Sequence, residues 1–453
     1  MKAIKNKEFN KKLLSLVLPI AFQQFMLNLV SASDALMLGF IGQNELSAVS
    51  LAGQIQFVLS LFLTAMTIGT NIFAAQYWGK KDIDSVEKIF AIAIRVSAPI
   101  SALCTFGTAV FPSYIMQLFT TDTALVEAGA SYLRLVSPSY LLCGISQIYL
   151  CVMKNTGQAK KGTLITSVCA TLDAGMNAVL IFGLFGFPGM SIAGAAISTT
   201  VTRLVELCWC IVTLPLSETV SLRSQYIHYP DAWLRKDFWK YTSPVLANEL
   251  IWGIGFTMYT VIMGHLGSDA VAANSIAGIA KNLVICFCSG LASGGGILVG
   301  NELGAGNLAL AKEYGAKLTK MSIISGLITG GILLCATPVV VHCVNLSDTA
   351  NNYLTGMLVA GAIYLVGKSV NCMTIAGIFC AGGDSKFGLY CDAVVMWCIT
   401  VPLGLLAAFI FKLPVLVVHC IVNADEIFKL PAVYKHYKKY LWVKDLTIKE
   451  NEL

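Results

Sequence analysis

Twelve long apolar runs are the feature that most constrains what this chain can fold into. Each run supplies the ~20 apolar residues that a helix needs to cross a bilayer, and short polar segments separate the runs. Of the 453 residues, 56% are hydrophobic and 12% are charged, whereas a soluble domain carries about 25% charged residues. We therefore predict an all-α polytopic membrane protein with twelve transmembrane helices. The runs cover roughly residues 13–39, 46–78, 86–111, 125–152, 160–183, 189–216, 238–265, 270–300, 315–341, 353–381, 388–411 and 413–434.

Lysine and arginine mark one side of the predicted membrane. The N-terminus, every second connection and the tail carry them, whereas the alternate connections FIGQNEL, PSYIMQLFTTDTALVE, GFP, HLGSDAV and HCVNLSDTANN carry none. Only Lys412, in the last outer turn, breaks the alternation. Because basic connections stay in the cytoplasm, we predict a multi-pass protein of the cell membrane with both termini cytoplasmic and an even number of spans. The net charge of +6 belongs to this pattern and does not indicate a nucleic-acid partner.

The chain contains an internal repeat at an offset of 225 residues. At this offset LGFIGQNELSAVSLAG lies over MGHLGSDAVAANSIAG, and Pro19 lies over Pro244. Six spans in each copy give both copies the same orientation, and the interface of such repeats is where transporters bind cargo. We predict two pseudo-symmetric six-helix bundles. The N-terminal lobe covers 1–216, a cytoplasmic linker 217–237, the C-terminal lobe 238–434 and a cytoplasmic tail 435–453.

The cysteines and histidines give no sign of a cofactor. Neither the 15 cysteines nor the five histidines have the spacing of a metal site. The cysteines are scattered through apolar runs, where a thiol packs as a small apolar group. No nucleophile motif accompanies them, so we expect no cofactor, no catalytic residue and no enzyme.

Acidic side chains inside the spans are the first candidate functional residues. Each costs about 2.5–3.5 kcal/mol at the centre of a span and therefore faces protein or water. Asp34 in the first span and Asp173 in the fifth come at similar depth, because both spans run outward. Asn177 follows Asp173 by four residues, on the same helical face. Two carboxylates in a pocket of low dielectric share a proton or a cation. We predict an H⁺ or Na⁺ switch here, with a structural hydrogen-bonded acid as the alternative.

Basic side chains also lie inside the spans. In the second half, Lys281 and Lys368 accompany the acid Glu249 near the middle of the membrane. One acid with two bases predicts a neutralising cluster, which would be a coupling site or a buried structural network. Arg203 and Glu206, in the sixth span, are three residues apart and can pair on one face; we interpret this pair as structural.

Pro19 and Pro244 occupy matching places near the inner ends of the first and seventh spans. Proline removes a helix hydrogen bond and permits a bend. A bend in the first span that depends on protonation of Asp34 is one hypothesis, and a passive kink is the other.

Taken together, these residues resemble the multidrug and toxic compound extrusion (MATE) family over nearly the whole chain. The similarity is carried by LSLVLPIAFQQ with Pro19, by Asp34 fifteen residues later before LGFIG, and by NIFAAQYWGKKD at the end of the second span. It continues with LIFGLFGFPGMSIAGAAISTTV and with SPVLANELIW. Each motif is modest, but their order and spacing together are specific.

The resemblance implies export of organic, often cationic or aromatic, compounds in exchange for H⁺ or Na⁺. It matches Asp34 to the acid of the N-lobe ion site, Asp173 and Asn177 to the fifth-helix pair, and Thr199 to a polar residue beside them. Asp34 and Asp173 would ligate the metal ion only if coupling used Na⁺. In the family the Asn commonly precedes the Asp, and the order is reversed here, so the resemblance leaves the ion open.

For the C-lobe, the resemblance matches Glu249 to the acid of the seventh helix. Some members add an acid in the tenth helix, where this chain has Ser369 beside Lys368. An ammonium at that place would repel Na⁺, so we expect coupling through the N-lobe, with H⁺ ahead of Na⁺.

Two other classes stay open at this point. The first is a lipid-linked oligosaccharide or lipid flippase of the same superfamily. The twelve-helix count argues for the exporter, and Lys281 and Lys368 argue for an anionic cargo. The second is a channel or a membrane enzyme, and the absence of a filter-like repeat, a metal cluster or a nucleophile motif argues against both. We expect small organic substrates and the lipid bilayer as partners, and a monomer suffices for this fold.

Overall fold

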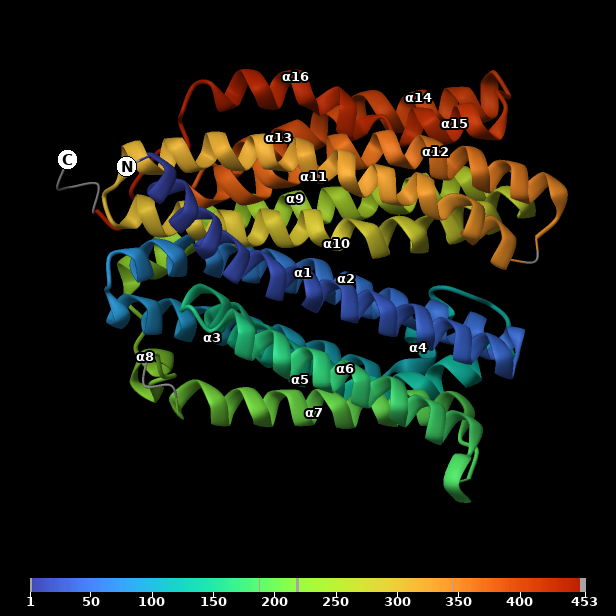
Figure 1. Ribbon diagram of the computed structural model, residues 1–453. Coiled ribbons are helices and arrows are strands. Elements are labelled where there is room, and N and C mark those ends of the chain that lie inside the picture. Colours follow the sequence, from blue (N-terminus) through green and yellow to red (C-terminus); the bar gives the residue numbers. More distant parts are fainter. Residues whose placement is uncertain (1, 187, 217–219, 345, 449–453) are drawn as a thin grey trace. The chain divides into compact units, whose positions relative to one another are not determined.

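The computed structural model describes residues 2–186, 188–216, 220–344 and 346–448. Every regular element in these ranges is a helix (Figure 1), which confirms the predicted fold class. The linker predicted at 217–237 and the tail predicted at 435–453 lie partly outside the described residues.

The helices follow the predicted runs closely. The first six runs fold as α1 (Lys2–Ile41), α2 (Gln43–Gly79), α3 (Ile83–Val110), α5 (Thr123–Asn155), α6 (Ala159–Phe182) and α7 (Ser191–Leu216). The next five fold as α9 (Ala232–Gly264), α10 (Ser268–Gly304), α11 (Leu308–Cys343), α12 (Asp348–Asn371) with the π-helix η2 (Cys372–Phe379), and the series α13 (Ser385–Asp392), η3 (Ala393–Thr400), α14 (Val401–Leu405) and η4 (Leu406–Ile410). The connections contain α4 (Pro112–Gln117), the 3₁₀-helix η1 (Leu184–Gly186) and α8 (Ser224–His228).

The twelfth run differs from the single helix that the sequence predicts. Eleven of the described helices are long and apolar enough to cross a membrane by length and composition. The run over 413–434 instead folds as α15 (Val415–Val422) and α16 (Asp425–Tyr437), with a break between them. Asp425 and Glu426 stand in the first turn of α16, where acids are stabilised by the N-terminal helix dipole. The polar residues therefore start a new helix within the apolar run.

The chain forms two compact units, which are described one at a time. The first-half unit comprises Met26–Ala74 and Ile83–Phe238, and the second-half unit comprises Met1–Phe25, Ala75–Asp82 and Trp239–Leu453. The start of α1 and the end of α2 thus belong to the second-half unit. The lobe boundaries that we draw from the sequence stay a prediction.

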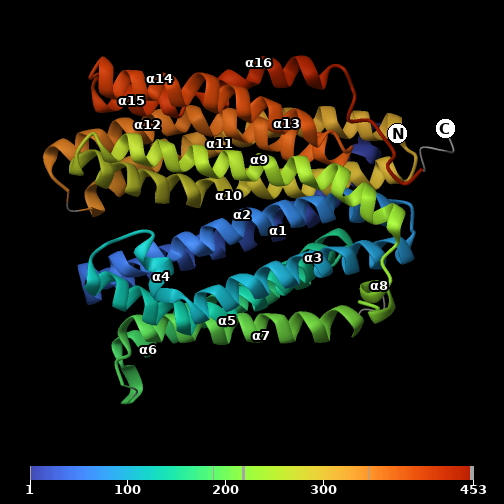
Figure 2. The ribbon, with the colours of Figure 1, turned by 180° about the vertical axis from the view of Figure 1, so that it is seen from behind.

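In the first-half unit, the segment after α7 is tied to the beginning of α3 (Figure 2). Glu87 is buried on α3, and one of its oxygens accepts hydrogen bonds from the backbone N–H (2.8 Å) and the hydroxyl (3.0 Å) of Ser221. Its other oxygen pairs with Nε of Arg223 at 2.7 Å. Arg95 donates to the carbonyl oxygen of Ile227 at 2.7 Å. These hydrogen bonds and the Arg223–Glu87 ion pair therefore hold α8 and the residues before it against α3.

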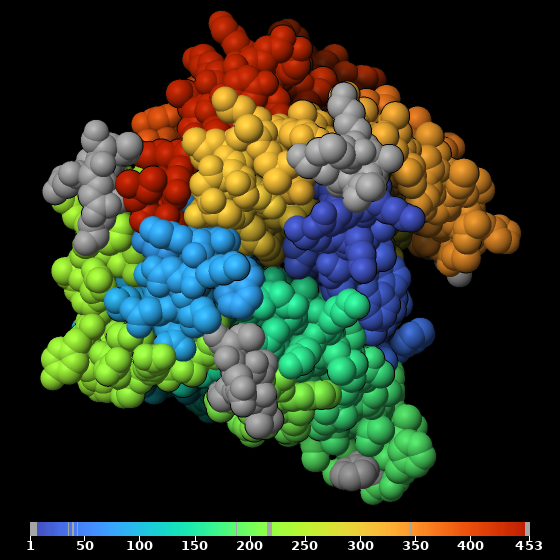
Figure 3. Space-filling view, turned by 60° about the vertical axis from the view of Figure 1, so that its left-hand side comes forward, coloured from blue at the N-terminus to red at the C-terminus, as the bar shows by residue number. Residues whose placement is uncertain are grey.

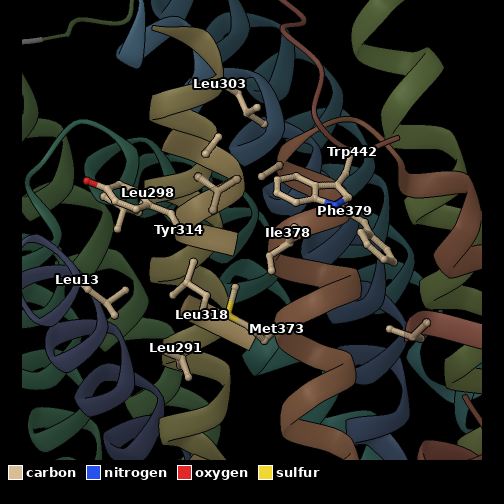
Figure 4. Close-up of a cluster of buried hydrophobic side chains, with 14 of the residues drawn as sticks. Leu13, Leu291, Leu298, Leu303, Tyr314, Leu318, Met373, Ile378, Phe379 and Trp442 are labelled. Carbon is tan, nitrogen blue, oxygen red and sulfur yellow. The ribbon is translucent and has the colours of Figure 1, made fainter. Parts of the chain in front are cut away.

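The second-half unit has a core to which α1, α10, α11, η2 and the tail all contribute (Figure 4). Leu13, Leu298, Leu318 and Met373 meet there, and Trp442 from the tail is fully buried among them. The start of α1 is thus anchored by apolar packing to helices that follow it by nearly 300 residues.

Glycine allows α10 to approach the end of α2 very closely. A Cβ atom on Gly304 would lie 1.9 Å from the carbonyl oxygen of Gln76, and one on Gly79 would lie 1.9 Å from the carbonyl oxygen of Asn301. No side chain fits at such a distance, so these two crossings need glycine, as close helix packing in membranes commonly does.

The tail after α16 folds back onto the same region. Figure 3 shows this red segment beside the light-blue end of α2. The side chain of Gln76 donates to the carbonyl oxygen of Ala381 at 2.7 Å and accepts from the backbone N–H of Leu446 at 2.7 Å. Trp442 packs against Gly315, where a Cβ atom would lie 2.7 Å from the indole ring. The end of α2 is therefore held by the tail through both hydrogen bonds and apolar contacts.

Pro19 and Pro244 lie inside α1 and α9, and both helices continue past them. The bend that we associate with these residues stays a prediction.

Candidate functional site

The first-half unit encloses a cavity of about 240 Å³ among α1, α2, α5, α6 and α7. Its wall includes Asp34, Asp173 and Thr199, three of the four residues that the sequence predicts for an N-lobe ion site. Arg203 and Glu206 line the same cavity. Residues from three different helices, α1, α6 and α7, thus bring three carboxyl groups and one guanidinium to one cavity.

The fourth predicted residue, Asn177, reaches this cavity through Asp34. Its side-chain N–H donates to Oδ1 of Asp34 at 2.8 Å. Asn177 is buried, and its side-chain oxygen has no hydrogen-bond partner in the described structure. An amide can present either its N–H or its oxygen to a carboxyl group. Asn177 is therefore able to serve both an ionised and a protonated Asp34.

Asp173 is held by hydroxyl groups from the neighbouring helix. Its Oδ1 accepts hydrogen bonds from Ser198 at 2.9 Å and from Thr202 at 3.1 Å. Ser198 and Thr202 are four residues apart on α7, so one helical face supplies both donors. This fixes one oxygen of Asp173 and aims the carboxyl group at the cavity.

Arg203 and Glu206 form the ion pair that their spacing predicts. Nη1 of Arg203 lies 2.9 Å from Oε2 of Glu206, and Ser146 on α5 donates to Oε1 of Glu206 at 2.7 Å. Glu206 is buried, with 2% of its side chain exposed, whereas 25% of the Arg203 side chain is exposed. Glu206 is therefore buried and held by Ser146, whereas the side chain of Arg203 is partly exposed.

The oxygens around this cavity suit a proton or a small hard cation. Carboxylate, amide and hydroxyl oxygens are the ligands that hard cations prefer. The buried oxygen of Asn177, which lacks a donor, is a position that such an ion or a carboxyl O–H can fill. Among the described residues, no group of three or more metal-ligating His, Cys, Asp or Glu side chains is present.

In the second-half unit, a different set of charges is brought together. Lys368 on α12 pairs with Glu426 at 2.9 Å. Lys429 lies 2.7 Å from Asp392 and 3.1 Å from Asp425. The side chain of Lys429 is 2% exposed, whereas that of Lys368 is 23% exposed, so the network is buried around Lys429.

The three residues predicted for a C-lobe cluster do not meet in one ion-pair network. Lys281 contacts Oδ1 of Asn423 at 3.4 Å and lies over the ring of Tyr364 at 5.3 Å, whereas Lys368 pairs with Glu426. Glu249, which is half-buried on α9, is not an ion-pair partner of either lysine in the described structure. Sequence position does not give the direction in which each side chain points around its helix, and the predicted depth of these residues stays a prediction.

Sequence reasoning missed the acids that neutralise the second-half lysines. Asp392, Asp425 and Glu426 all lie in runs that we assigned as spans, and Lys429 follows Asp425 by four residues. That spacing was a readable signal of a pair on one helical face. The partner in α12, 58 residues away from Glu426, was not readable.

The family model described as MatE matches the chain twice, over residues 19–179 and 244–406, and these matches cover more than half of its length. The chain belongs to the MATE family. The two matches begin at Pro19 and Pro244, the same pair that the internal repeat aligns, so each half of the chain is one copy of the MATE unit.

Curated relatives cover most of the chain at modest identity. The uncharacterized transporter YisQ of Bacillus subtilis is 23% identical over 95% of both chains. A probable multidrug resistance protein NorM from Thermotoga maritima is 23% identical over 73% of this chain and 71% of its own length. A NorM of Bacillus cereus is 24% identical over 88% of this chain and 89% of its own length.

Solved structures share the MATE fold. A MOP superfamily transporter from Pyrococcus furiosus is 16% identical and superposes with a TM-score of 0.86 over 96% of each chain. The MATE transporter VcmN from Vibrio cholerae is 15% identical and superposes with a TM-score of 0.86 over 97% of this chain and 99% of its own. These similarities show the fold of this chain, a polytopic membrane protein of a transporter family.

The MATE repeat also relates the two charged clusters. The repeat lays Ser146 over Asn371, and each donates to a glutamate in the last helical segment of its half. Ser146 donates to Glu206 at 2.7 Å, and Asn371 donates to Glu426 at 2.8 Å. In the first half Arg203, the partner of the glutamate, lines a cavity, whereas in the second half Lys429 is buried among three acids.

Proposed function

We propose that this protein is a secondary active multidrug exporter that exchanges organic, cationic or aromatic compounds for H⁺ by alternating access. Membership of the MATE family supports this proposal, and so do relatives whose names describe them as probable multidrug resistance proteins. The same membership supports an exporter over the lipid flippase that the sequence left open. The coupling ion and the chemical class of the cargo belong to the proposal.

One observation carries the proposal: Asp34 and Asp173 line a single cavity. Two carboxylates at close quarters in a medium of low dielectric repel each other, so the cavity is stabilised by taking up one positive charge. When that charge leaves, the repulsion returns. A cavity that gains and loses a cation in this way can couple ion movement to a change in the first half of the protein.

Asn177 gives the cavity two stable arrangements. With Asp34 ionised, the amide N–H donates to the carboxylate, as observed at 2.8 Å. With Asp34 protonated, rotation of the amide lets its oxygen accept the carboxyl O–H. In both states Asp34 is then hydrogen-bonded to Asn177, so neither form of its carboxyl group is left without a partner.

The energy available for export is sufficient for useful work. One proton entering across roughly 100 mV supplies about 2.3 kcal/mol, and a pH gradient adds to it. The departure of a monovalent cationic drug opposes the same field. Export of a cation one-for-one against a proton therefore depends on the pH gradient, because the electrical terms cancel.

In this proposal the protein lies in the plasma membrane with both termini cytoplasmic and works as a monomer. The alternation of basic connections supports this orientation. The start of α1 and the described end of the tail lie at the same end of the second-half unit (Figures 1 and 2), as two cytoplasmic termini require.

The experiment that tests the function is efflux of a fluorescent organic cation from vesicles. The wild-type protein, Asp34→Asn and Glu127→Gln are reconstituted separately, and an H⁺ or a Na⁺ gradient is imposed. Glu127 is the matched control, since it is an exposed acid on α5 outside the cavity. We expect gradient-driven efflux for the wild type and Glu127→Gln, and none for Asp34→Asn. Equal efflux by all three would remove Asp34 from the mechanism, and wild-type vesicles that respond to neither gradient would refute ion-coupled export.

A further inference from the structure

We infer that Arg203 is a resident cation of the first-half cavity and that it sets the ion selectivity of the cavity, favouring H⁺ over Na⁺. This inference rests on the function proposed above. From the sequence alone, Arg203 is interpreted only as part of a structural ion pair with Glu206.

The guanidinium of Arg203 lines the cavity and uses one of its nitrogens for its ion pair with Glu206. Arg203 lines the cavity and forms one ion pair, through Nη1 to Glu206 at 2.9 Å. A guanidinium has five N–H donors, and Glu206 engages one nitrogen. The side chain of Arg203 is 25% exposed and lines the cavity, so part of it is not covered by packed protein.

The second step is that Glu206 is committed to a fixed position. Its side chain is 2% exposed, and Ser146 donates to the oxygen that Arg203 does not use. Both carboxylate oxygens thus have partners from the protein. Glu206 holds Arg203 in place and takes no part in binding an ion from solution.

The third step is the charge count of the cavity. Its charged lining groups are Asp34 on α1, Asp173 on α6, and Arg203 and Glu206 on α7, and α2 contributes none. The Arg203–Glu206 pair is neutral, so Asp34 and Asp173 are the two carboxyl groups left to bind an ion. The remaining titratable lining groups are Tyr132, Tyr140, Cys143 and Cys169.

The fourth step compares what H⁺ and Na⁺ require of these carboxyl groups. A proton needs a single oxygen, whereas a dehydrated metal cation needs several oxygen ligands at once. Oδ1 of Asp173 already accepts from Ser198 and Thr202. Arg203, which stays charged at all accessible pH values, lines the same cavity, so its charge acts against a metal cation that needs several of the oxygens that remain. A second positive ion with its own ligand demand is therefore disfavoured more than a proton is.

Lys429 in the second half of the chain is the contrasting case, a basic side chain that is buried among acids. There Glu426 is paired with Lys368, and Lys429 is surrounded by Asp392 and Asp425. Lys429 is 2% exposed, so it has no face open to an ion. Arg203 differs from Lys429 in having one acidic partner and a side chain that is 25% exposed, and in these two features it resembles Lys368, whose side chain is 23% exposed.

The test compares ion preference, which a structural role would not alter. Wild-type protein, Arg203→Lys and the double variant Arg203→Gln/Glu206→Gln are reconstituted, and efflux of a fluorescent cation is driven by either a pH gradient or a Na⁺ gradient alone. The double variant removes both charges and so leaves no buried charge without its partner. Arg134→Gln is the control, since Arg134 is an arginine of the same unit on α5 that lines a different depression.

We expect the wild type and Arg134→Gln to respond to the pH gradient and not to the Na⁺ gradient. Arg203→Lys keeps the charge and should keep the preference for H⁺. In the double variant the ratio of Na⁺-driven to H⁺-driven efflux should rise by about tenfold or more. An unchanged ratio in a well-expressed double variant overturns the inference.

A measurement on the wild type alone guards against a double variant that fails to fold. Binding of radioactive Na⁺ at alkaline pH, where H⁺ is scarce, should be undetectable in wild-type protein. Na⁺ binding that is lost in Asp34→Asn, or wild-type efflux driven by Na⁺, would overturn the role of Arg203 while leaving ion-coupled export intact. Failure of both gradients to drive wild-type efflux would instead refute the proposed function.

Discussion

Removal of the ammonium of Lys429 should destabilise the second-half unit more than any exposed charge does. Lys429 on α16 lies 2.7 Å from Asp392, 3.1 Å from Asp425 and 3.7 Å from Glu426, and its side chain is 2% exposed. The substitution Lys429→Met keeps much of the apolar stem and deletes the charge. Three buried carboxylates are then left with Lys368 as their nearby base.

The size of the effect follows from burial rather than from distance. At an effective dielectric constant of about 20, opposite charges at the 2.7 Å separation of Lys429 and Asp392 attract by about 6 kcal/mol. Much of this attraction offsets the loss of hydration, but deletion of one partner of a buried pair still costs about 3–5 kcal/mol, because the other charge stays buried. Lys317 and Glu313 are also 2.7 Å apart, with side chains 26% and 51% exposed. An exposed pair of this kind contributes only about 0–1 kcal/mol.

The assay is reversible unfolding in mixed detergent and SDS micelles, followed by tryptophan fluorescence. We expect Lys429→Met to lower the free energy of unfolding by about 3–5 kcal/mol and Lys317→Met to lower it by about 1 kcal/mol or less. Adding Asp392→Asn to Lys429→Met should recover part of the loss, because one fewer carboxylate is then left without its cation. Equal stability of the two single lysine variants would show that burial does not set the strength of this network, and the reasoning would fail.

Three further substitutions test other parts of the structure. Gly304→Ala places a Cβ atom 1.9 Å from the carbonyl oxygen of Gln76 and should sharply reduce the yield of monodisperse protein in size-exclusion chromatography. Gly278→Ala, with nothing within 4 Å of the new atom, should leave the yield unchanged, so equal yields would contradict the close crossing. Trp442→Ala should release the tail and cost about 3–5 kcal/mol; a tail that stays resistant to limited proteolysis would argue against its docking. Asn177→Leu should abolish ion-driven efflux at normal expression, and wild-type efflux would exclude the amide from the ion cycle.

The sequence predicted the helices and the repeat because bilayer thickness and the cost of a buried charge act locally along the chain. A run of about 20 apolar residues is long enough to span a membrane whatever it packs against. The same logic predicted that Asp34 and Asp173 lie at one depth, and the family resemblance added Thr199; the structure brings all three to one cavity. Asn177 was found by its spacing of four residues from Asp173, although its bond is to Asp34.

Partners far apart in sequence could not be predicted in the same way. Hydropathy favours one helix over 413–434, but Lys368 and Asn371 on α12 stabilise Glu426 at the beginning of α16. This makes a charged helix start tolerable inside an apolar run. Prediction of the break would have required the rotation of α12 about its axis, which a pattern of apolar residues fixes only loosely.

The two halves illustrate how a repeat can diverge in charge while it keeps its fold. In the second half, Lys368 and Lys429 stand beside the acids that would otherwise attract an ion. With two lysines for the three acids Asp392, Asp425 and Glu426, this cluster gains less from a further cation than the first-half cavity, where one arginine accompanies three acids. In the first half, Arg203 forms its ion pair with Glu206. The negative charges of Asp34 and Asp173 are therefore the ones that a bound cation would neutralise. That imbalance supports our proposal that coupling takes place in the first half.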